Sequence, residues 1–169
     1  MGFRRSNMHM RKRGGAEAIF QYIRIVVTSV VGATWTGFQE IEYSDDGGAT
    51  WFPTSNMTSN ILPSPLVASA SAVYTTFAAW KAYDGGTTNR WTANVNGGWS
   101  TIDLGSGNGR APDRIRLTNN NTGGAGDSSP TEIKVYGSNT GAFSGEEVLL
   151  HTESGLGSLP DGTVSIYVF

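Results

Sequence analysis

Short runs of β-branched and aromatic residues, separated by turns rich in Gly and Asn, recur along this chain and constrain its fold more than any other feature. Side chains in the run Ile19–Ser29 fall into two alternating sets, which predicts a strand with one face in a core. The run Phe38–Ser44 alternates in the same way, and it predicts that Phe38, Glu40 and Glu42 share one face of a second strand.

Further runs predict the rest of a β protein. Strands are expected at about residues 100–104, 113–118, 131–138, 147–151 and 163–168, with a short one near 66–68. Residues 74–83 predict one or two helical turns that pack Phe77 and Trp80 inward, and residues 119–129 predict a flexible loop. The chain shows no internal repeat and no long amphipathic helix. Seven or eight evenly spaced strands predict an all-β fold, a sandwich of about eight antiparallel strands.

Charge divides the chain into two parts. Residues 1–14 hold five cations and no acid, whereas the remainder has seven Lys and Arg against fourteen Asp and Glu. We therefore expect a flexible basic arm over residues 1–16 and one domain over residues 17–169. The arm can be an unstructured start or a tail that docks on a partner, and both interpretations stay open. Its cations are Arg4, Arg5, Arg11, Lys12 and Arg13.

Several function classes are excluded or disfavoured by composition. The chain has no apolar run of the roughly 18 residues that a spanning helix needs, so no membrane insertion is expected. It has no cysteine, and hence no disulfide and no thiolate zinc site. The acidic body would repel a nucleic acid duplex, so nucleic acid is not an expected partner.

One hairpin has a recognisable pattern. The segment Ser44-Asp-Asp-Gly-Gly-Ala-Thr-Trp51 fits Ser-x-Asp-x-Gly-x-Thr-Trp and resembles the Asp-box hairpin of sialidases and other β proteins. The resemblance implies that an Asp side chain caps backbone N–H groups of the turn and that Trp51 packs beneath it. This motif carries no catalytic residue, so it predicts a hairpin rather than a hydrolase.

Four motifs follow one another in register over about residues 79–139. They are Ala82-Tyr-Asp84-Gly85 followed by Thr-Asn-Arg-Trp91, then Gly98-Trp-Ser-Thr-Ile-Asp-Leu-Gly105, Ile115-Arg-Leu117 and Ser129-Pro-Thr-Glu-Ile-Lys-Val-Tyr-Gly-Ser138. Together they resemble discoidin-type domains, also called coagulation-factor C-type or galactose-binding-like domains. The resemblance implies a discoidin-like jelly-roll β-sandwich in which Trp91 and Trp99 pack in the core. The early strands Tyr22-Ile-Arg-Ile25 and Phe38-Gln-Glu-Ile-Glu42 are similar in order to variants found in phage tail and other virion proteins.

Enzyme signatures are weak. The only histidines are His9 and His151, and no Gly-x-Ser-x-Gly nucleophile elbow occurs. Glu40 and Glu42 would stand about 7 Å apart along a strand, a spacing that a glycosidase pair can have. Same-face acids two residues apart are more often a solvated edge, so we expect a protein that is not an enzyme.

The resemblance implies a calcium site. Many members of the family hold one Ca²⁺ between the Asp-Gly loop and a Glu of a strand, and Ca²⁺ prefers six to eight oxygen ligands. Here Asp84 and Glu40 would supply carboxylates, on the order of 5 Å apart, and Asn89 a side-chain oxygen where the family has Thr. Lys81, Gly86 and Gln39 would supply backbone oxygens. Alternatively, Asp84 only caps its own turn.

Ligand binding in this family uses aromatic residues on loops at one end of the sandwich. Trp35 lies in a Gly/Thr loop outside any strand pattern, and we expect it to be an exposed platform for a sugar ring. Arg90 and Asn96 are expected to hydrogen-bond sugar hydroxyls, and Arg90 could also bind the carboxylate of an acidic sugar. Surface Trp and Arg serve protein interfaces equally well.

These features together predict a non-enzymatic virion protein, on a phage tail or capsid surface, with a carbohydrate-binding module for host attachment. Its arm would contact other virion proteins, and several copies would form a homo-oligomer in the assembly. One alternative is a carbohydrate-binding module of a secreted or cell-surface protein, which would place the chain outside the cell. The other is a decoration or cement protein with no glycan ligand.

Overall fold

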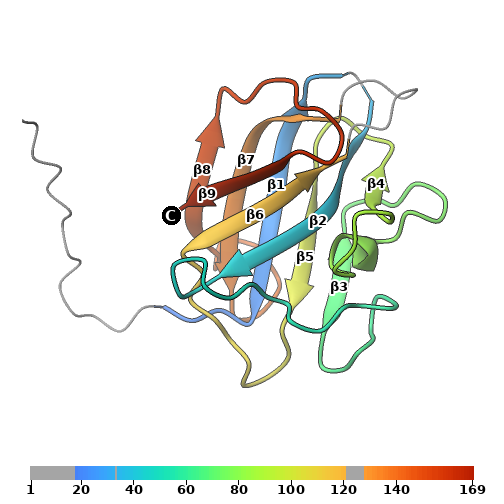
Figure 1. Ribbon diagram of the computed structural model, residues 1–169. Helices are drawn as coiled ribbons and strands as arrows, with labels where there is room; N and C mark the ends of the chain where they lie inside the picture. Colours follow the sequence, from blue (N-terminus) through green and yellow to red (C-terminus); the bar gives the residue numbers. More distant parts are fainter. Residues whose placement is uncertain (1–17, 33, 121–127) are drawn as a thin grey trace, which may run out of the picture.

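The structure, a computed structural model, describes residues 18–32, 34–120 and 128–169. It is an all-β sandwich of two antiparallel sheets packed face to face (Figure 1). The predicted β-sandwich is therefore confirmed, whereas the predicted arm lies outside the described residues. Nine strands occur in the described part of the chain, one more than the eight expected.

Five strands form one sheet and four form the other. The five-stranded sheet has the order β3 (Val67–Ala70), β5 (Gly98–Asp103), β1 (Tyr22–Val30), β7 (Pro130–Ser138) and β8 (Val148–Ser154). The four-stranded sheet has the order β4 (Trp91–Ala93), β2 (Thr36–Ser44), β6 (Arg114–Asn119) and β9 (Val164–Val168). The extra strand is β4, which is only three residues long and pairs with β2.

Strand β1 lies at the centre of its sheet and alternates as the sequence predicts. Ile23, Ile25 and Val27 are buried in the core, while the residues between them are half-buried on the outer face. Arg24 lies on that outer face between two aromatic rings, 3.9 Å from the ring centre of Trp99 and 3.7 Å from that of Phe143. Trp99 is therefore not the core residue that we expected.

Strand β2 does not alternate as the sequence predicts. Its ladder with β6 pairs Phe38 with Asn119 and Glu40 with Thr118, which leaves Gln39 as the extra residue of a β-bulge. Because of the bulge, Phe38 and Ile41 both face the core although they are three residues apart. The expectation that Phe38 shares a face with Glu40 is wrong.

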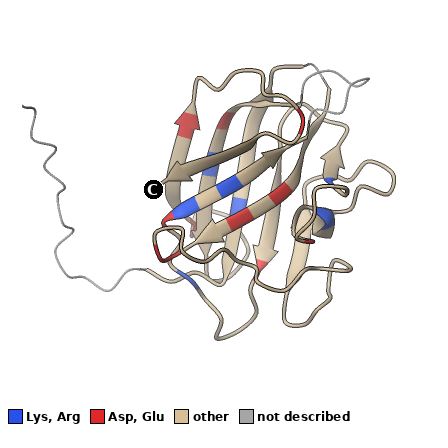
Figure 2. Cartoon of the chain, viewed as in Figure 1, with Lys and Arg blue, Asp and Glu red and all other residues tan. Residues whose placement is uncertain are grey.

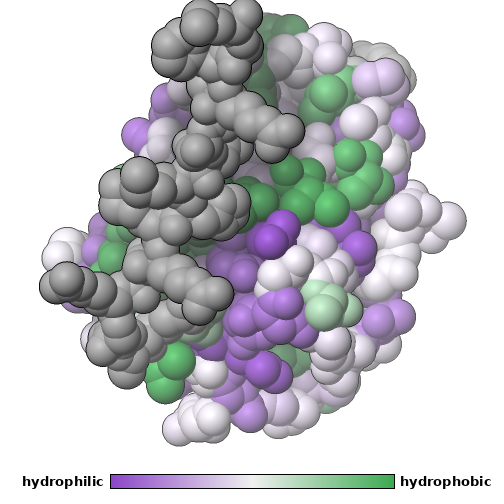
Figure 3. All heavy atoms as spheres, turned by 60° about the vertical axis from the view of Figure 1, so that its left-hand side comes forward, coloured by the Kyte–Doolittle hydropathy of each residue, from purple (hydrophilic) through white to green (hydrophobic). Residues whose placement is uncertain are grey.

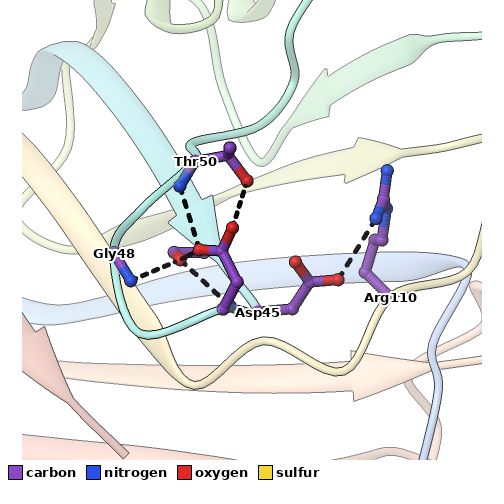
Figure 4. Close-up of polar contacts among 6 residues, drawn as sticks. Asp45, Gly48, Thr50 and Arg110 are labelled. Atoms are coloured by element: carbon purple, nitrogen blue, oxygen red, sulfur yellow. Dashed lines mark hydrogen bonds and ion pairs between the residues drawn. The ribbon is translucent and has the colours of Figure 1, made fainter.

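The hairpin after β2 has the structure that its pattern implies (Figure 4). The carboxylate of Asp46 accepts hydrogen bonds from the Thr50 backbone N–H at 2.9 Å and the Thr50 hydroxyl at 2.6 Å. The Ser44 hydroxyl oxygen accepts the N–H of Gly48 at 2.9 Å. Trp51 packs against Gly48 on one side of the turn and lies under the Arg116 guanidinium, 4.4 Å from its ring centre.

The stretch predicted to form one or two helical turns contains a tight turn, in which the Phe77 N–H donates to the Tyr74 carbonyl, followed by one 3₁₀ turn. Only Ala79–Ala82 form a helix, a single 3₁₀ turn labelled η1, and no helix in the described ranges is long enough to cross a membrane. Before it, the chain runs beside β4: the Tyr74 N–H donates to the Thr92 carbonyl, and the Thr92 N–H donates to the Phe77 carbonyl. Trp80 packs against the core, as expected, but Phe77 is only half-buried.

The two edge strands β8 and β9 lie on the same side of the molecule (Figure 1). Strand β9 pairs only with β6, and its outward side chains Val164, Ile166 and Val168 are all more than half exposed. A hydrophobic band crosses the middle of the surface when this side is turned forward (Figure 3). An apolar edge strand of this kind is a ready contact surface for another chain.

Candidate functional site

The Asp84 turn and strand β2 meet at one backbone N–H. The N–H of Gly86 donates to Oε2 of Glu40 at 3.2 Å and to Oδ1 of Asp84 at 2.9 Å. The two carboxylates are therefore neighbours, because they share one donor. Gly85 makes the turn with a φ of +71°, a left-handed conformation that glycine adopts without strain.

Glu40 is an electrostatically unusual carboxylate. It is only 6% exposed, and burial raises its pKa to about 9, with the nearby charges of Asp84 and Glu42 adding to the effect. Hydrogen bonds from the backbone N–H groups of Gly85 and Gly86 oppose this rise only in part. No Lys, Arg or His of the described segments forms an ion pair with Glu40.

Glu40 and Glu42 share the outer face of the four-stranded sheet, as predicted, but they do not form a solvated edge. Acidic residues on β2 lie beside basic residues on β6 (Figure 2). The guanidinium of Arg116 holds Glu42 with two hydrogen bonds, from Nε at 2.6 Å and from Nη2 at 2.5 Å. A pocket of about 270 Å³ opens over this face. Its lining is Glu40, Glu42, Gly85, Gly86, Thr87, Arg116, Thr118 and Val164.

Of the other residues predicted to bind calcium, Asn89 contacts Asp84, whereas Gln39 and Lys81, which were expected to offer backbone oxygens, have side chains that contact other residues. Nδ2 of Asn89 donates to Oδ2 of Asp84 at 2.7 Å, so the amide nitrogen rather than the oxygen faces the carboxylate. The Gln39 side chain donates to Asp161 at 3.1 Å, and the Lys81 ammonium lies near the rings of Phe77 and Trp80. Across the described residues, no three His, Cys, Asp or Glu side chains come together as a metal-holding group. The capping role of Asp84 is present in the structure.

An aromatic surface of Trp35, Tyr74 and Phe77 lies beside this turn. The ring centres of Trp35 and Tyr74 are 4.2 Å apart, edge to face, and those of Tyr74 and Phe77 are 6.3 Å apart and nearly parallel. Tyr74 is 38% exposed, and Trp35 and Phe77 are half-buried. The Arg90 guanidinium lies 4.5 Å from the ring centre of Phe77.

The pairing of β2 with β4 brings these residues together. Trp35 directly precedes β2, Arg90 directly precedes β4, and the segment holding Tyr74 and Phe77 runs beside β4. A side chain at Gly37 would collide with the backbone of β4, so the close approach of the two strands requires glycine there.

Two of the three predicted ligand-binding residues lie on one surface, and the aromatic rings that link them were not predicted from the sequence. Trp35 and Arg90 belong to the same surface, linked by Tyr74 and Phe77. Asn96 has a role in the fold, since its Oδ1 accepts the N–H of Val30 at 2.9 Å. Tyr74 and Phe77 were hidden in a stretch whose pattern predicts a helix that turns Phe77 inward.

The remaining candidate, His151, lies on the edge strand β8. Its ring stacks on Phe169 with ring centres 5.1 Å apart, and its Nε2 is 3.4 Å from Oε2 of Glu153.

Comparisons with family models, curated proteins and solved structures found no match for this chain. The discoidin-type resemblance therefore rests on the sequence motifs, and the function has to be argued from the geometry.

Proposed function

We propose that this protein is a non-enzymatic virion component, of a phage tail or capsid surface, with a carbohydrate-binding module for attachment to a host. Its sandwich is the discoidin-like jelly roll that the motifs imply. The observation that carries the binding function is the aromatic surface, in which Trp35, Tyr74 and Phe77 lie in one row with Arg90 at its end.

The aromatic surface suits a sugar for physical reasons. A pyranose ring has a face of C–H groups that packs on an aromatic ring, and hydroxyls at its rim that need hydrogen-bond partners. Tyr74 supplies an exposed ring and a hydroxyl, and Arg90 supplies several N–H donors in a fixed plane. Rings held by one another lose little conformational freedom when a ligand binds.

The virion setting has separate support. It rests on the resemblance to phage tail and virion variants and on the five cations of residues 1–14. The apolar edge of Val164, Ile166 and Val168 offers a surface for contact between copies in a homo-oligomer. A gene located among capsid or tail genes would support this setting. A gene beside a secreted enzyme would instead favour the module of an extracellular protein.

Calcium is a proposed ligand of the turn. Glu40 and Asp84 would hold it, because two adjacent carboxylates with no cationic partner among the described residues are relieved by a divalent cation. An amide flip at Asn89 would turn its oxygen toward the ion. Bound Ca²⁺ would fix the turn from which Arg90 extends.

A glycan array probed with the full chain tests the binding function, with hits quantified by calorimetry. We expect binding to at least one glycan, and a loss of tenfold or more in Tyr74→Ala. Trp51→Ala is the matched control, because Trp51 also forms an aromatic–cation contact, with Arg116, but lies at the hairpin. An array with no hits would overturn the proposal and favour a cement protein.

A further inference from the structure

The aromatic surface also carries positive charge that forms no ion pair with an acid of the described residues. Seven Lys and Arg residues lie beyond the first 17 residues of the chain. Four of them form ion pairs, and a fifth, Arg24, is enclosed between two rings with its Nε bonded to Thr101. The four pairs are Arg110 with Asp45, Arg114 with Asp113, Arg116 with Glu42 and Lys134 with Glu132.

The two cations that remain are Lys81 and Arg90, and both approach the same ring. The Arg90 guanidinium lies 4.5 Å and the Lys81 ammonium 5.9 Å from the ring centre of Phe77. Neither comes within ion-pair distance of an acid in the part of the chain that the structure describes. Both charges thus approach one aromatic ring, and neither has an ion-pair partner among the described residues.

The nearest acid in the sequence does not serve as a counter-charge. Asp84 is the only Asp or Glu between Asp46 and Asp103, and it lies between Lys81 and Arg90 in the chain. Its Oδ1 accepts the Gly86 N–H that also bonds Glu40, and its Oδ2 accepts Nδ2 of Asn89. Among the described residues, Asp84 therefore lies next to Glu40 and forms no ion pair with Lys81 or Arg90.

We propose that the ligand of the aromatic surface is an anionic glycan whose carboxylate or sulfate binds Arg90 and Lys81. This inference rests on the proposed function and specifies its substrate class. The sugar ring packs on Tyr74, whose ring is nearly parallel to that of Phe77, and its acidic group reaches the two cations at the end of the row. Contact with Phe77 orients the guanidinium, and its N–H edge can then hold the two oxygens of an acid side by side.

Matched pairs of sugars test this inference on the full chain. The probes are oligosaccharides ending in glucuronate or in glucose, and in 6-sulfated or unmodified galactose. Comparison of the two acidic probes distinguishes carboxylate from sulfate as the preferred group. We expect at least one acidic probe to bind about tenfold or more tightly than its neutral counterpart, with a preference that shrinks as NaCl rises from about 50 to 500 mM.

Three variants test which residues cause the preference for acidic sugars. Arg90→Gln should abolish the preference for the acidic sugar, because it lowers affinity for the acidic probe about tenfold more than affinity for the neutral one, and Lys81→Gln should reduce the preference severalfold. Lys134→Gln is the control, because it removes a cation on the five-stranded sheet that is already paired with Glu132. Binding of neutral sugars with no acidic preference, or a preference that survives Arg90→Gln, would overturn this inference and leave the proposed function standing. If neither acidic nor neutral sugars bind, both fail.

Discussion

Glu40 and Glu42 stand two residues apart on one face of β2, but Glu40 is buried, whereas Glu42 is half-buried and paired with a cation. Glu42 is held by the guanidinium of Arg116, which also covers Trp51. Glu40 has backbone N–H groups and no cation of the described chain, and its pKa is raised to about 9. The same residue type on the same strand thus forms an ion pair in one position and, in the other, a buried carboxyl group with no ionic partner in the described chain.

The comparison shows how far backbone N–H dipoles can offset the effect of burial on the pKa of a carboxyl group. The N–H groups of Gly85 and Gly86 lower the pKa of Glu40, but burial and the charges of Asp84 and Glu42 outweigh them. A full positive charge is required to compensate. Arg116 supplies one to Glu42, and an incoming cation would supply one to Glu40.

The largest effect that we expect is a pH dependence due to Glu40. A carboxyl group whose pKa is raised on folding stabilises the fold below its ordinary pKa of 4.5, and this stabilisation is lost as the pH rises toward about 9. With a chelator present to remove metal ions, the unfolding free energy should fall as the pH rises across this range, with a limiting slope of about 1.4 kcal/mol per pH unit.

Denaturant titrations of Glu40→Gln and Glu42→Gln over this pH range would check the origin of the slope. Glu40→Gln should be nearly flat and more stable than the parent at pH 8. Glu42→Gln should keep most of the slope although it loses the Arg116 pair. An equal slope in the parent and Glu40→Gln would contradict the raised pKa.

The second-largest effect is expected from loss of Arg116, the cation that pairs with Glu42. Arg116→Met should destabilise the protein by about 2 kcal/mol at neutral pH, because it leaves Glu42 partly buried and unpaired and uncovers Trp51. Chemical denaturation measures the loss. Restoring stability with the double variant Glu42→Gln/Arg116→Met would show that the unpaired carboxylate causes it, and an additive double variant would show that it does not.

The third effect is stabilisation by Ca²⁺. At about ten times its dissociation constant, the ion should add roughly 1.4 kcal/mol to the unfolding free energy, and more at pH 8 than at pH 6 because its ligands must lose protons. Thermal unfolding with Ca²⁺ and with chelator measures this. Asp84→Asn and Glu40→Gln should not respond, whereas Asp46→Asn, which changes an acid of the hairpin, should respond like the parent. An equal shift in all variants would indicate a nonspecific effect.

The smallest effect is expected from Asp46. Its contribution to stability changes with pH in the opposite direction to that of Glu40. Hydrogen bonds from Thr50 and Ser44 lower the pKa of this exposed carboxyl group. Its contribution to stability is therefore present above the ordinary Asp pKa of 3.8 and is lost as the pH falls below that value. Asp46→Asn should unfold at a slightly lower temperature at pH 7 and differ less from the parent at pH 3.

Local chemistry explains which parts of the fold the sequence could predict. The predictions of the alternation of β1 and of the Ser44–Trp51 hairpin are correct. The hairpin contacts lie within a few residues, and the strand follows a strict period. Strand β4 was missed because three residues carry too little periodicity, and its place is set by β2. The bulge at Gln39 and the half-buried, outer-face position of Trp99 depend on neighbouring strands, so no local pattern reveals them.

The carboxylate side and the aromatic side of the site could be predicted from the sequence to different extents. The proximity of Glu40 and Asp84 was expected only through the family resemblance, and the structure brings the two carboxylates together. On the aromatic side, Trp35 and Arg90 were named separately as exposed residues. Their connection through Tyr74 and Phe77 depends on a tight turn docked beside β4, where the sequence pattern favours a helix.

The bulge at Gln39 also sets the phase of β2 between the two sides of the site. Without the bulge, Gln39 would take a regular place in the ladder with β6, and the preceding part of the strand would shift by one residue against its neighbour. Phe38 would then share the outer face with Glu40 and leave the core, and Trp35 would point to the opposite face from its present partners. The bulge thus fixes the orientation of the aromatic surface relative to the carboxylate pair, and an unbulged strand would separate the two.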